Sequence, residues 1–163
     1  MTATRRDAQR SKVYRWERLA IDKWPVGVTQ PPALTLAECQ ALVNRIWRNH
    51  SPRFPEGRVW AGKIMYNAPK VRHSRGTWAW GGLNWIKLPP WARDPRVVCH
   101  EVGHALVYGD RHGPTYVRVY IELLARYCGA DRTELAASAK EAGVKVAPWA
   151  TTKRALRLRG LGG

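Results

Sequence analysis

The stretch VVCHEVGHALVYGDRHGP, residues 97–114, holds two histidines four positions apart, with a glutamate directly after the first. In an α-helix, residues i and i+4 share one face, so His100 and His104 can bind one metal ion through their imidazole nitrogens. Glu101 lies one step round the helix, where its carboxylate can reach a water molecule on that ion. This HExxH spacing supplies two zinc ligands and a general base. The pattern therefore predicts a hydrolytic Zn²⁺ site with Glu101 as the catalytic residue.

A catalytic zinc ion commonly has three protein ligands and one open position. We favour His112 as the third metal ligand, because a turn after the helix can fold it back towards the ion. Asp110 has the spacing of the third metzincin ligand, but Val107 stands where that pattern has glycine. Glu122 lies on the following helix, as the third gluzincin ligand does, but off its apolar face. Asp110 and Glu122 remain alternatives.

The alternative interpretation of this stretch is a core helix with incidental histidines. The chain has five histidines, and three fall within residues 100–112. The motif also follows a helix start, with Asp94 as N-cap and a proline at the first helical position. Gly103 costs the helix about 1 kcal/mol relative to alanine, and a close backbone approach is a reason to keep it. We place His50 at a helix end and His73 in an exposed loop, and favour the metal site.

The hydrophobic periodicity and the cap residues predict five helices separated by a β region. Thr35 and Glu38 form a capping box at the start of the second helix. Short aromatic and β-branched segments predict three strands, which we expect to form a small, mostly antiparallel sheet. The expected helices are 5–23, 35–49, 95–107, 114–127 and 132–142, and the expected strands are 58–67, 76–80 and 83–88. The fold class is therefore α+β, with one domain at 1–150 and a basic, flexible tail at 151–163.

The segment HEVGHALVYGDRHGPTY resembles the zinc site of SprT-like metallopeptidases, in which HExxH is followed by a variable turn and then HGP with an aromatic residue. The resemblance implies a minimal zincin-like domain with His100, His104 and His112 as ligands and Glu101 as general base. It also implies a packing role for Tyr116. Many SprT-like proteins carry a cysteine-rich zinc ribbon, but this chain has no CxxC pair. Any action on DNA would therefore depend on its basic surface.

Most of the chain, roughly residues 5–147, is similar to a family of small metallohydrolases of actinobacteria and their phages. The similar segments are RDAQRSKVYRWE, TLAECQALV, LPPWAR before HExxH, the HGP turn and LAASAKEAGVKV. This resemblance implies hydrolysis without specifying a substrate.

The chain is strongly basic, with 28 lysines and arginines against 12 acidic residues and a formal charge of +16. Such a charge attracts polyanions, so nucleic acid is a candidate partner, and solvated surface charge is the alternative. The termini RRDAQRSK and TTKRALRLR are candidates for phosphate contacts. Trp78, Trp80 and Trp85 can stack on bases, but we favour a core-packing role for them.

The positions of the cysteines and the hydropathy give expectations about the cellular compartment of the protein. Cys39, Cys99 and Cys128 are too scattered for a disulfide framework, which indicates a reducing environment. We expect Cys99 to be a buried small side chain. No apolar run approaches the roughly 20 residues of a membrane span, and no secretory signal is apparent. We expect a soluble monomer in the bacterial cytoplasm, or in the host cytoplasm if phage-encoded, without membrane contact.

Taken together, the motif and the resemblance predict a zinc-dependent metallohydrolase, most specifically a metallopeptidase acting on proteins or peptides. The resemblance implies that an edge strand, at 83–88 or a neighbour, pairs with an extended substrate. One alternative is an amide hydrolase of a small molecule or cell-wall fragment, which needs a closed pocket. The other is a basic nucleic-acid-binding protein with a structural zinc ion, for which a fourth ligand such as Asp110 would close the coordination.

Overall fold

The computed structural model describes residues 7–22, 32–53, 59–60, 63–64 and 67–149. Five α-helices and two small sheets make up this part of the chain, and the α+β class is confirmed. The basic tail expected at 151–163 lies outside the described residues. The helices are α1 Arg10–Trp16, α2 Leu36–His50, α3 Pro95–Leu106, α4 Pro114–Cys128 and α5 Arg132–Glu141.

The main sheet has three strands in the order β3-β5-β4. Strand β5 (Trp85–Leu88) lies in the middle, parallel to β3 (Lys70–His73) and antiparallel to β4 (Trp80–Gly81). Strands β1 (Val59–Trp60) and β2 (Lys63–Ile64) pair antiparallel in a separate two-stranded sheet.

The prediction of a mostly antiparallel three-stranded sheet was wrong, because the sheet is mixed and β3 was assigned to a loop. In β3, Val71 is the one partly buried residue, and the other three positions are exposed and polar. A strand with so short an apolar pattern gives a weak periodic signal. His73 is accordingly the last residue of β3 and contacts Arg93 at 2.9 Å.

Local capping explains where most helices begin and end. Thr35 and Glu38 form both hydrogen bonds of the predicted capping box, and Asp94 accepts from the Arg96 backbone with a proline at the first helical position. Gly129, with φ of 70°, ends α4 in the left-handed conformation. The first helix is shorter than predicted, because its α-helical part begins at Arg10 and residues 17–21 wind as a π-helical turn.

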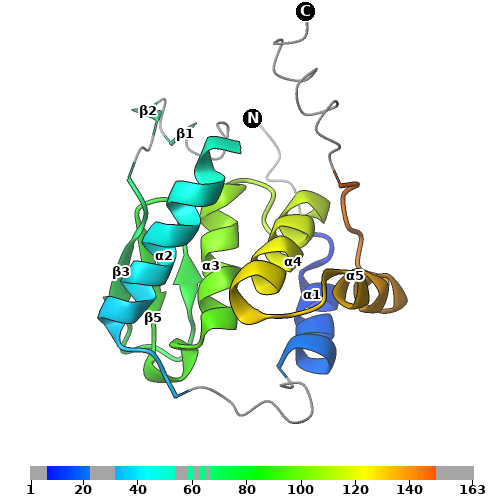
Figure 1. Ribbon diagram of the computed structural model, residues 1–163, viewed down its shortest axis with the longest axis horizontal. Coiled ribbons are helices and arrows are strands. Elements are labelled where there is room, and N and C mark those ends of the chain that lie inside the picture. The colour runs from blue at the N-terminus through cyan, green and yellow to red at the C-terminus, as the bar shows by residue number, and fades with distance from the viewer. Residues whose placement is uncertain (1–6, 23–31, 54–58, 61–62, 65–66, 150–163) are drawn as a thin grey trace, which may run out of the picture.

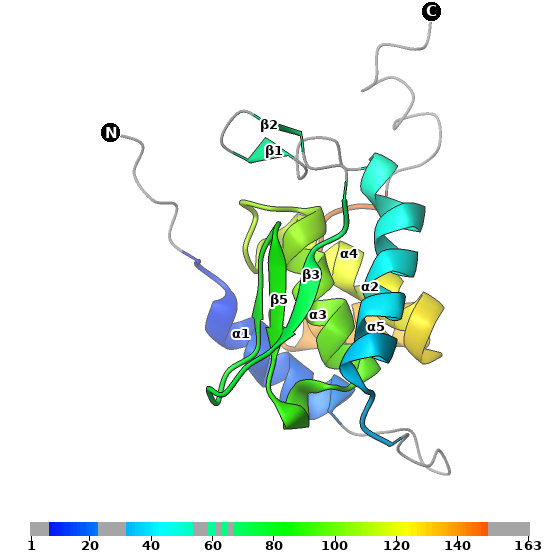
Figure 2. The same cartoon turned by 90° about the vertical axis from the view of Figure 1, so that its left-hand side faces the viewer.

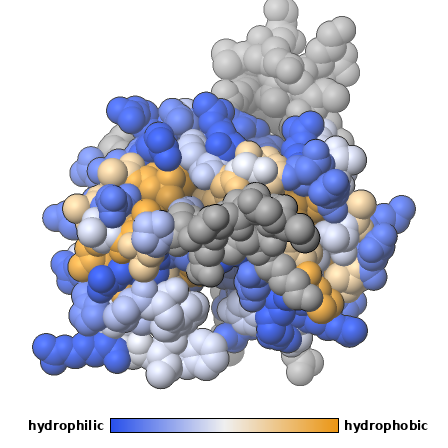
Figure 3. All heavy atoms as spheres, turned by 60° about the horizontal axis from the view of Figure 1, so that its bottom comes forward, coloured by the Kyte–Doolittle hydropathy of each residue, from blue (hydrophilic) through white to orange (hydrophobic). Residues whose placement is uncertain are grey.

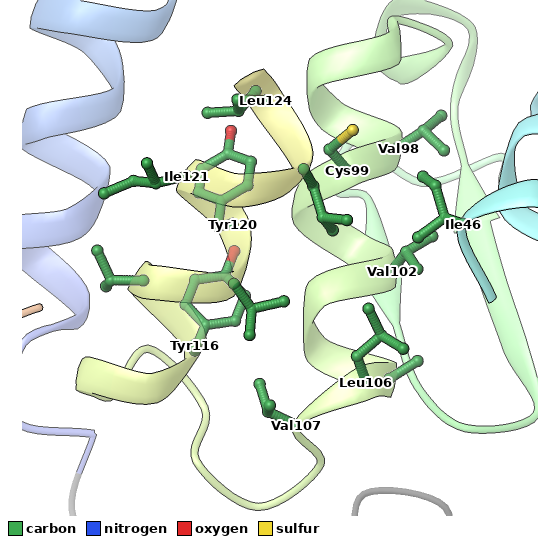
Figure 4. Close-up of a cluster of buried hydrophobic side chains, with 14 of the residues drawn as sticks. Ile46, Val98, Cys99, Val102, Leu106, Val107, Tyr116, Tyr120, Ile121 and Leu124 are labelled. Carbon is green, nitrogen blue, oxygen red and sulfur yellow. The ribbon is translucent and has the colours of Figure 1, made fainter. Parts of the chain in front are cut away.

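Helix α3, which carries the HExxH motif, lies in the middle of the molecule. Helices α2 and α3 cover one face of the main sheet, and α4 lies against α3 (Figures 1 and 2). Figure 4 shows Val102 and Leu106 of α3 beside Ile46 of α2, with Tyr116 and Tyr120 of α4 on the other side. Because α3 is packed from several sides, the positions of its site residues are fixed by the core.

Cys99 is fully buried in this core, as expected, with its Sγ atom 3.9 Å from that of Cys128. None of the described helices has the length and apolar character needed to cross a membrane. Figure 3 shows a face on which hydrophilic residues surround smaller hydrophobic patches.

Candidate metal centre

The structure brings together the three histidines favoured as ligands. His100 and His104 lie one turn apart on α3, and His112 comes from the turn between α3 and α4. Their ligand nitrogens all lie within 4.8 Å of one another, and the Nε2 atoms of His100 and His104 are 3.1 Å apart. In a tetrahedral zinc site the ligand nitrogens are about 3.4 Å apart. The cluster is therefore compact enough to hold one metal ion.

The turn after α3 places His112 through two left-handed residues. Gly109 has φ of 99° and Arg111 has φ of 52°, and an L-residue at positive φ is held there by its surroundings. Gln9 stabilises the reversed chain, because its Nε2 donates to the His112 carbonyl at 2.7 Å and to the Lys145 carbonyl at 3.1 Å. The buried Gln9 amide therefore joins the N-terminal helix and the last described segment to the turn that carries His112.

Neither alternative third ligand lies in the cluster. The Asp110 carboxylate accepts from the Tyr116 backbone N–H at 2.9 Å, which caps the first turn of α4. A Cβ added at Gly113 would collide with the same carboxylate, so Asp110 is packed beneath that turn. Glu122 forms an ion pair with Arg53 at 3.2 Å. Both carboxylates therefore stabilise α4 and its surroundings.

Two carboxylates of the N-terminal segment contact the histidines. Glu17 Oε1 lies 2.5 Å from Nδ1 of His100, and Asp7 Oδ2 lies 2.7 Å from Nδ1 of His112. A histidine that donates Nδ1–H to a carboxylate presents the lone pair of Nε2 to a metal. Sequence reasoning missed both partners, which lie 83 and 105 positions from their histidines. The charged helical pattern of residues 5–23 was the only signal available for them.

His104 has a different set of supports. A hydrogen bond to the Arg111 backbone orients its imidazole. The Tyr116 ring stacks on it, with ring centroids 4.3 Å apart and an interplanar angle of 11°. Gly103 permits this stacking, because a Cβ there would lie 3.0 Å from Cε2 of Tyr116. The close approach expected at Gly103 is thus present, and Tyr116 has the packing role implied by the resemblance.

One atom of the cluster lacks a hydrogen-bond partner. Nε2 of His112 is buried, and no group in the described part of the chain bonds to it. An unsatisfied buried polar atom costs about 1–3 kcal/mol. Because Nδ1 of His112 bonds to Asp7, Nε2 is the ring nitrogen that is left to bind a metal ion. The three residues therefore fit a metal ion, which would satisfy this nitrogen.

The electrostatics of the metal-free cluster couple the histidines. Burial lowers the pKa of His100, but the carboxylates of Glu17 and Glu101 outweigh it and raise that pKa to about 9. Burial and the neighbouring positive charges of His100 and His112 hold the pKa of His104 well below its usual value. Without a metal, a protonated His100 can therefore donate to Glu17 and to the Nε2 atom of neutral His104.

The carboxylate of Glu101 lies between α3 and the sheet. Burial raises its pKa, His100 lowers it and Glu17 raises it, and the net shift is upward. Strand β4 approaches closely, because a Cβ added at Gly81 would lie 2.7 Å from Oε2 of Glu101. A buried carboxyl with a raised pKa is suited to accept and return a proton near neutral pH.

A cavity of about 730 Å³ opens onto His100 and Glu101. Tyr14 of α1 lines this cavity together with Trp78 and Trp91, which have exposed fractions of 82% and 61%. This volume is within the range of small-molecule and peptide side-chain pockets. The histidine cluster is therefore accessible from the side that carries Glu101.

The expectation that Trp78, Trp80 and Trp85 pack in the core was wrong. Their exposed fractions are 82%, 53% and 36%. The core positions of the sheet are taken instead by Ile86 and Leu88, which alternate with exposed residues along β5. The helices cover one face of this sheet, so the side chains of the other face remain in solvent.

No protein-family model matches this chain, and no curated protein or solved structure is significantly similar to it.

Proposed function

We propose that this protein is a zinc-dependent metallohydrolase of the zincin type and that it acts as a peptidase. The observation that carries the proposal is the cluster of His100, His104 and His112, whose ligand nitrogens lie within 4.8 Å of one another next to the buried Glu101. Three protein nitrogens leave one coordination position for water or substrate, as in catalytic zinc sites. A bound zinc ion supplies a Lewis acid and lowers the pKa of its water to about 7.

Glu101 is the general base and later the general acid in this proposal. Its raised pKa allows it to take a proton from water and to return it to the leaving amine. Gly81 lies against this residue on the sheet side, where an added Cβ would collide with the carboxylate.

Tyr14 is the candidate for stabilising the developing oxyanion. Its ring centroid lies 6.0 Å from that of His100 and 4.9 Å from that of His112, and it lines the cavity. Burial raises the pKa of Tyr14, and a hydrogen bond with Arg10 lowers it by less. The phenol therefore keeps its proton at neutral pH and can donate a hydrogen bond to a negatively charged oxygen.

The sheet offers one edge for pairing with an extended substrate. The β3 edge is closed, because the Gln40 side chain of α2 accepts from the Val71 N–H at 2.7 Å and donates to the Pro69 carbonyl at 3.1 Å. Strand β4 forms the opposite edge and lies against Glu101. Strand β5, considered for this role from the sequence, is central, so β4 is the strand we propose for backbone recognition of a peptide.

Metal analysis of purified wild type, Glu101→Gln and His112→Ala, prepared without chelator or affinity-tag metal, tests the site. We expect near-stoichiometric zinc in wild type and Glu101→Gln, and a marked loss in His112→Ala. A peptide-library screen should then show cleavage by wild type and none by Glu101→Gln. A wild-type protein that takes up no zinc on reconstitution would refute the proposal.

Two other functions predict different results. A structural zinc ion needs a fourth protein ligand, and the one cluster of metal-binding side chains in the described residues contains three. An amide hydrolase of small substrates would retain the zinc but leave the peptide library intact, and amide-bonded small molecules and cell-wall fragments would be cleaved instead.

A further inference from the structure

The face of the main sheet that the helices leave uncovered carries a regular set of side chains. Lys70 of β3 pairs with Trp85 of β5, and Arg72 of β3 pairs with Lys87 of β5, which pairs in turn with Trp80 of β4. Paired residues on neighbouring strands point to the same side of a sheet. All five are exposed, whereas Ile86 and Leu88 point to the helices. We call these five exposed residues the outer sheet face.

The outer sheet face is positively charged. Three of its residues are lysine or arginine, and no described carboxylate forms an ion pair with Lys70, Arg72 or Lys87. The surrounding sequence, residues 57–93, contains seven lysines and arginines, five of the nine tryptophans and no aspartate or glutamate. The face therefore combines positive charge and aromatic surface within a segment that has no acidic residue.

The rings of both tryptophans of this face pack against neighbouring residues. The Arg72 guanidinium lies 3.9 Å from the centre of the Trp85 ring. The Trp80 ring lies over Gly82, where an added Cβ would come within 2.7 Å of Cη2. Gly82 stands opposite Trp85, and its N–H donates to the Trp85 carbonyl at 3.0 Å. Trp80 and Trp85 are therefore a diagonal pair across two strands, about 7 Å apart.

We propose that the outer sheet face binds single-stranded nucleic acid, with bases stacked on Trp80 and Trp85 and phosphates on Lys70, Arg72 and Lys87. Aromatic side chains stack on bases only where those bases are free of a duplex, and the stacking is tolerant of sequence. Interleaved cations track the phosphate backbone and make the affinity salt-dependent. The exposed rings and the absence of acidic residues distinguish this face from an ordinary solvated basic surface.

This binding site is separate from the metal centre. Figure 2 looks onto the sheet with α3 behind it, so the outer face lies on the side away from the helix that carries His100 and His104. Nucleic-acid binding is therefore expected to persist in Glu101→Gln and His112→Ala. Failure of the peptidase proposal would leave this site unaffected.

Fluorescence anisotropy tests the cationic part of the site. The probes are labelled oligothymidylate and oligouridylate of about 20 nucleotides and a duplex of the same length. In the variant Lys70→Ala/Arg72→Ala/Lys87→Ala we expect the affinity for both single strands to fall by about tenfold or more. The slope of log affinity against log salt should decrease by about 2, since each phosphate contact in a single strand contributes about 0.7.

The matched control removes the same charge elsewhere. Lys12, Arg48 and Lys140 are exposed on α1, α2 and α5, and their replacement by alanine should change the affinity by less than about threefold. Equal losses in the two triple variants would mean diffuse attraction by net charge and would overturn the proposal. Binding of the duplex at least as tight as that of the single strands would also overturn it.

The aromatic part is tested by Trp80→Ala and Trp80→Phe. Alanine should weaken single-strand binding by about tenfold, in keeping with the loss of one base stack, with the salt slope unchanged, and phenylalanine should restore most of the affinity. Ultraviolet crosslinking of wild type to a 4-thiouridine oligonucleotide provides a readout that needs no variant. Crosslinked peptides from residues 70–88 are expected, and crosslinks confined to other segments would contradict the site.

Discussion

The carboxylate of Glu17 lies 2.5 Å from Nδ1 of His100, although 83 positions separate the two residues. Glu17 is the first residue of the π-helical turn that follows α1. Helix α1 is fixed against α5 by a hydrogen bond from Trp16 Nε1 to Ser138 Oγ at 2.9 Å. The N-terminal helix therefore lies behind the histidine cluster, and its packing positions the carboxylate that contacts His100 on α3.

We predict that Glu17→Gln weakens zinc binding by about 10–100-fold, the range typical for loss of a partner behind a metal ligand. The neutral amide can still contact Nδ1, but it no longer stabilises the orientation and basicity of His100 with a negative charge. Competition with a chelator of known zinc affinity measures the change. Glu141→Gln is the matched control, since Glu141 is exposed on α5. Equal affinities of wild type and Glu17→Gln would contradict the role assigned to this carboxylate.

Features that depend on nearby residues were predictable from the sequence. The capping box at Thr35, the Asp94 cap and the HExxH spacing each involve residues no more than four positions apart, and all are present. Asp7, Gln9 and Glu17 could not be predicted, because their roles depend on how α1 packs against α3 and the turn that follows it.

The exposed tryptophans could not be predicted for a related reason. The period-2 pattern of β5 shows which residues share a face of the sheet, but not which face the helices cover. Trp85 and Lys87 share the solvent face, while Ile86 and Leu88 share the core face. The sequence-based interpretation placed the tryptophans in the core. In the structure, the helices pack against the face of the sheet that carries the aliphatic residues.

The pH dependence of zinc binding should report on His100. Its pKa in the metal-free protein is about 9, because Glu17 and Glu101 outweigh the opposing effect of burial. A histidine must be neutral to bind zinc. Below about pH 9, zinc binding must therefore displace one proton from His100. Apparent zinc affinity should rise about tenfold per pH unit from pH 7 and level off above about pH 9. In Glu17→Gln the zinc affinity should reach its plateau at a lower pH. An unchanged pH profile would exclude His100 as the titrating group.

The same pKa predicts a loss of stability in the metal-free protein as pH rises. His100 binds its proton more tightly in the folded state than an unperturbed histidine, whose pKa is 6.5. Its contribution is therefore complete below about pH 6.5 and disappears as pH passes through about 9. Urea unfolding of the metal-free protein across this range measures the slope, and His100→Gln should remove this part of it.

Replacement of Asp110 distinguishes a helix-capping role from a metal-binding role for this residue. Asp110→Ala should lower the free energy of unfolding by about 0.5–2 kcal/mol through loss of a helix cap, while zinc content stays at the wild-type level. Asp110→Asn keeps an acceptor for the Tyr116 N–H and should be close to wild type in both. Loss of zinc in Asp110→Ala with unchanged stability would instead identify Asp110 as a ligand.

Tyr14→Phe tests the proposed oxyanion donor. Removal of one such donor lowers kcat by about 100–1000-fold in other hydrolases. We predict a reduction of this order in peptide cleavage, with KM and zinc content unchanged, because the phenyl ring still packs against His100 and His112. Tyr108 is 51% exposed on the turn after α3, and Tyr108→Phe should retain full activity. A fall in zinc content in Tyr14→Phe would assign the residue to packing instead.

Gly81→Ala should separate metal binding from catalysis. A Cβ at this position would lie 2.7 Å from Oε2 of Glu101 and closer still to its carbonyl oxygen, so β4 or the glutamate must move. Because that carbonyl belongs to the backbone of α3, which is fixed by the core, β4 must shift and the Glu101 side chain must rotate to relieve both contacts. We therefore predict that peptide cleavage falls by at least about 100-fold, since small misplacements of a catalytic group have effects of this size.

The three atoms nearest to a Cβ at Gly81 all belong to Glu101, so zinc content in Gly81→Ala should remain near that of wild type, and stability should fall by about 1–3 kcal/mol through overpacking. Gly76→Ala is the control, because an added Cβ there would meet only Ser74 Oγ at 3.5 Å. It should leave zinc content, stability and cleavage unchanged. If Gly81→Ala retained full activity, the contact between β4 and Glu101 would not position the catalytic base, and the assignment of β4 as the substrate edge would lose its main structural support.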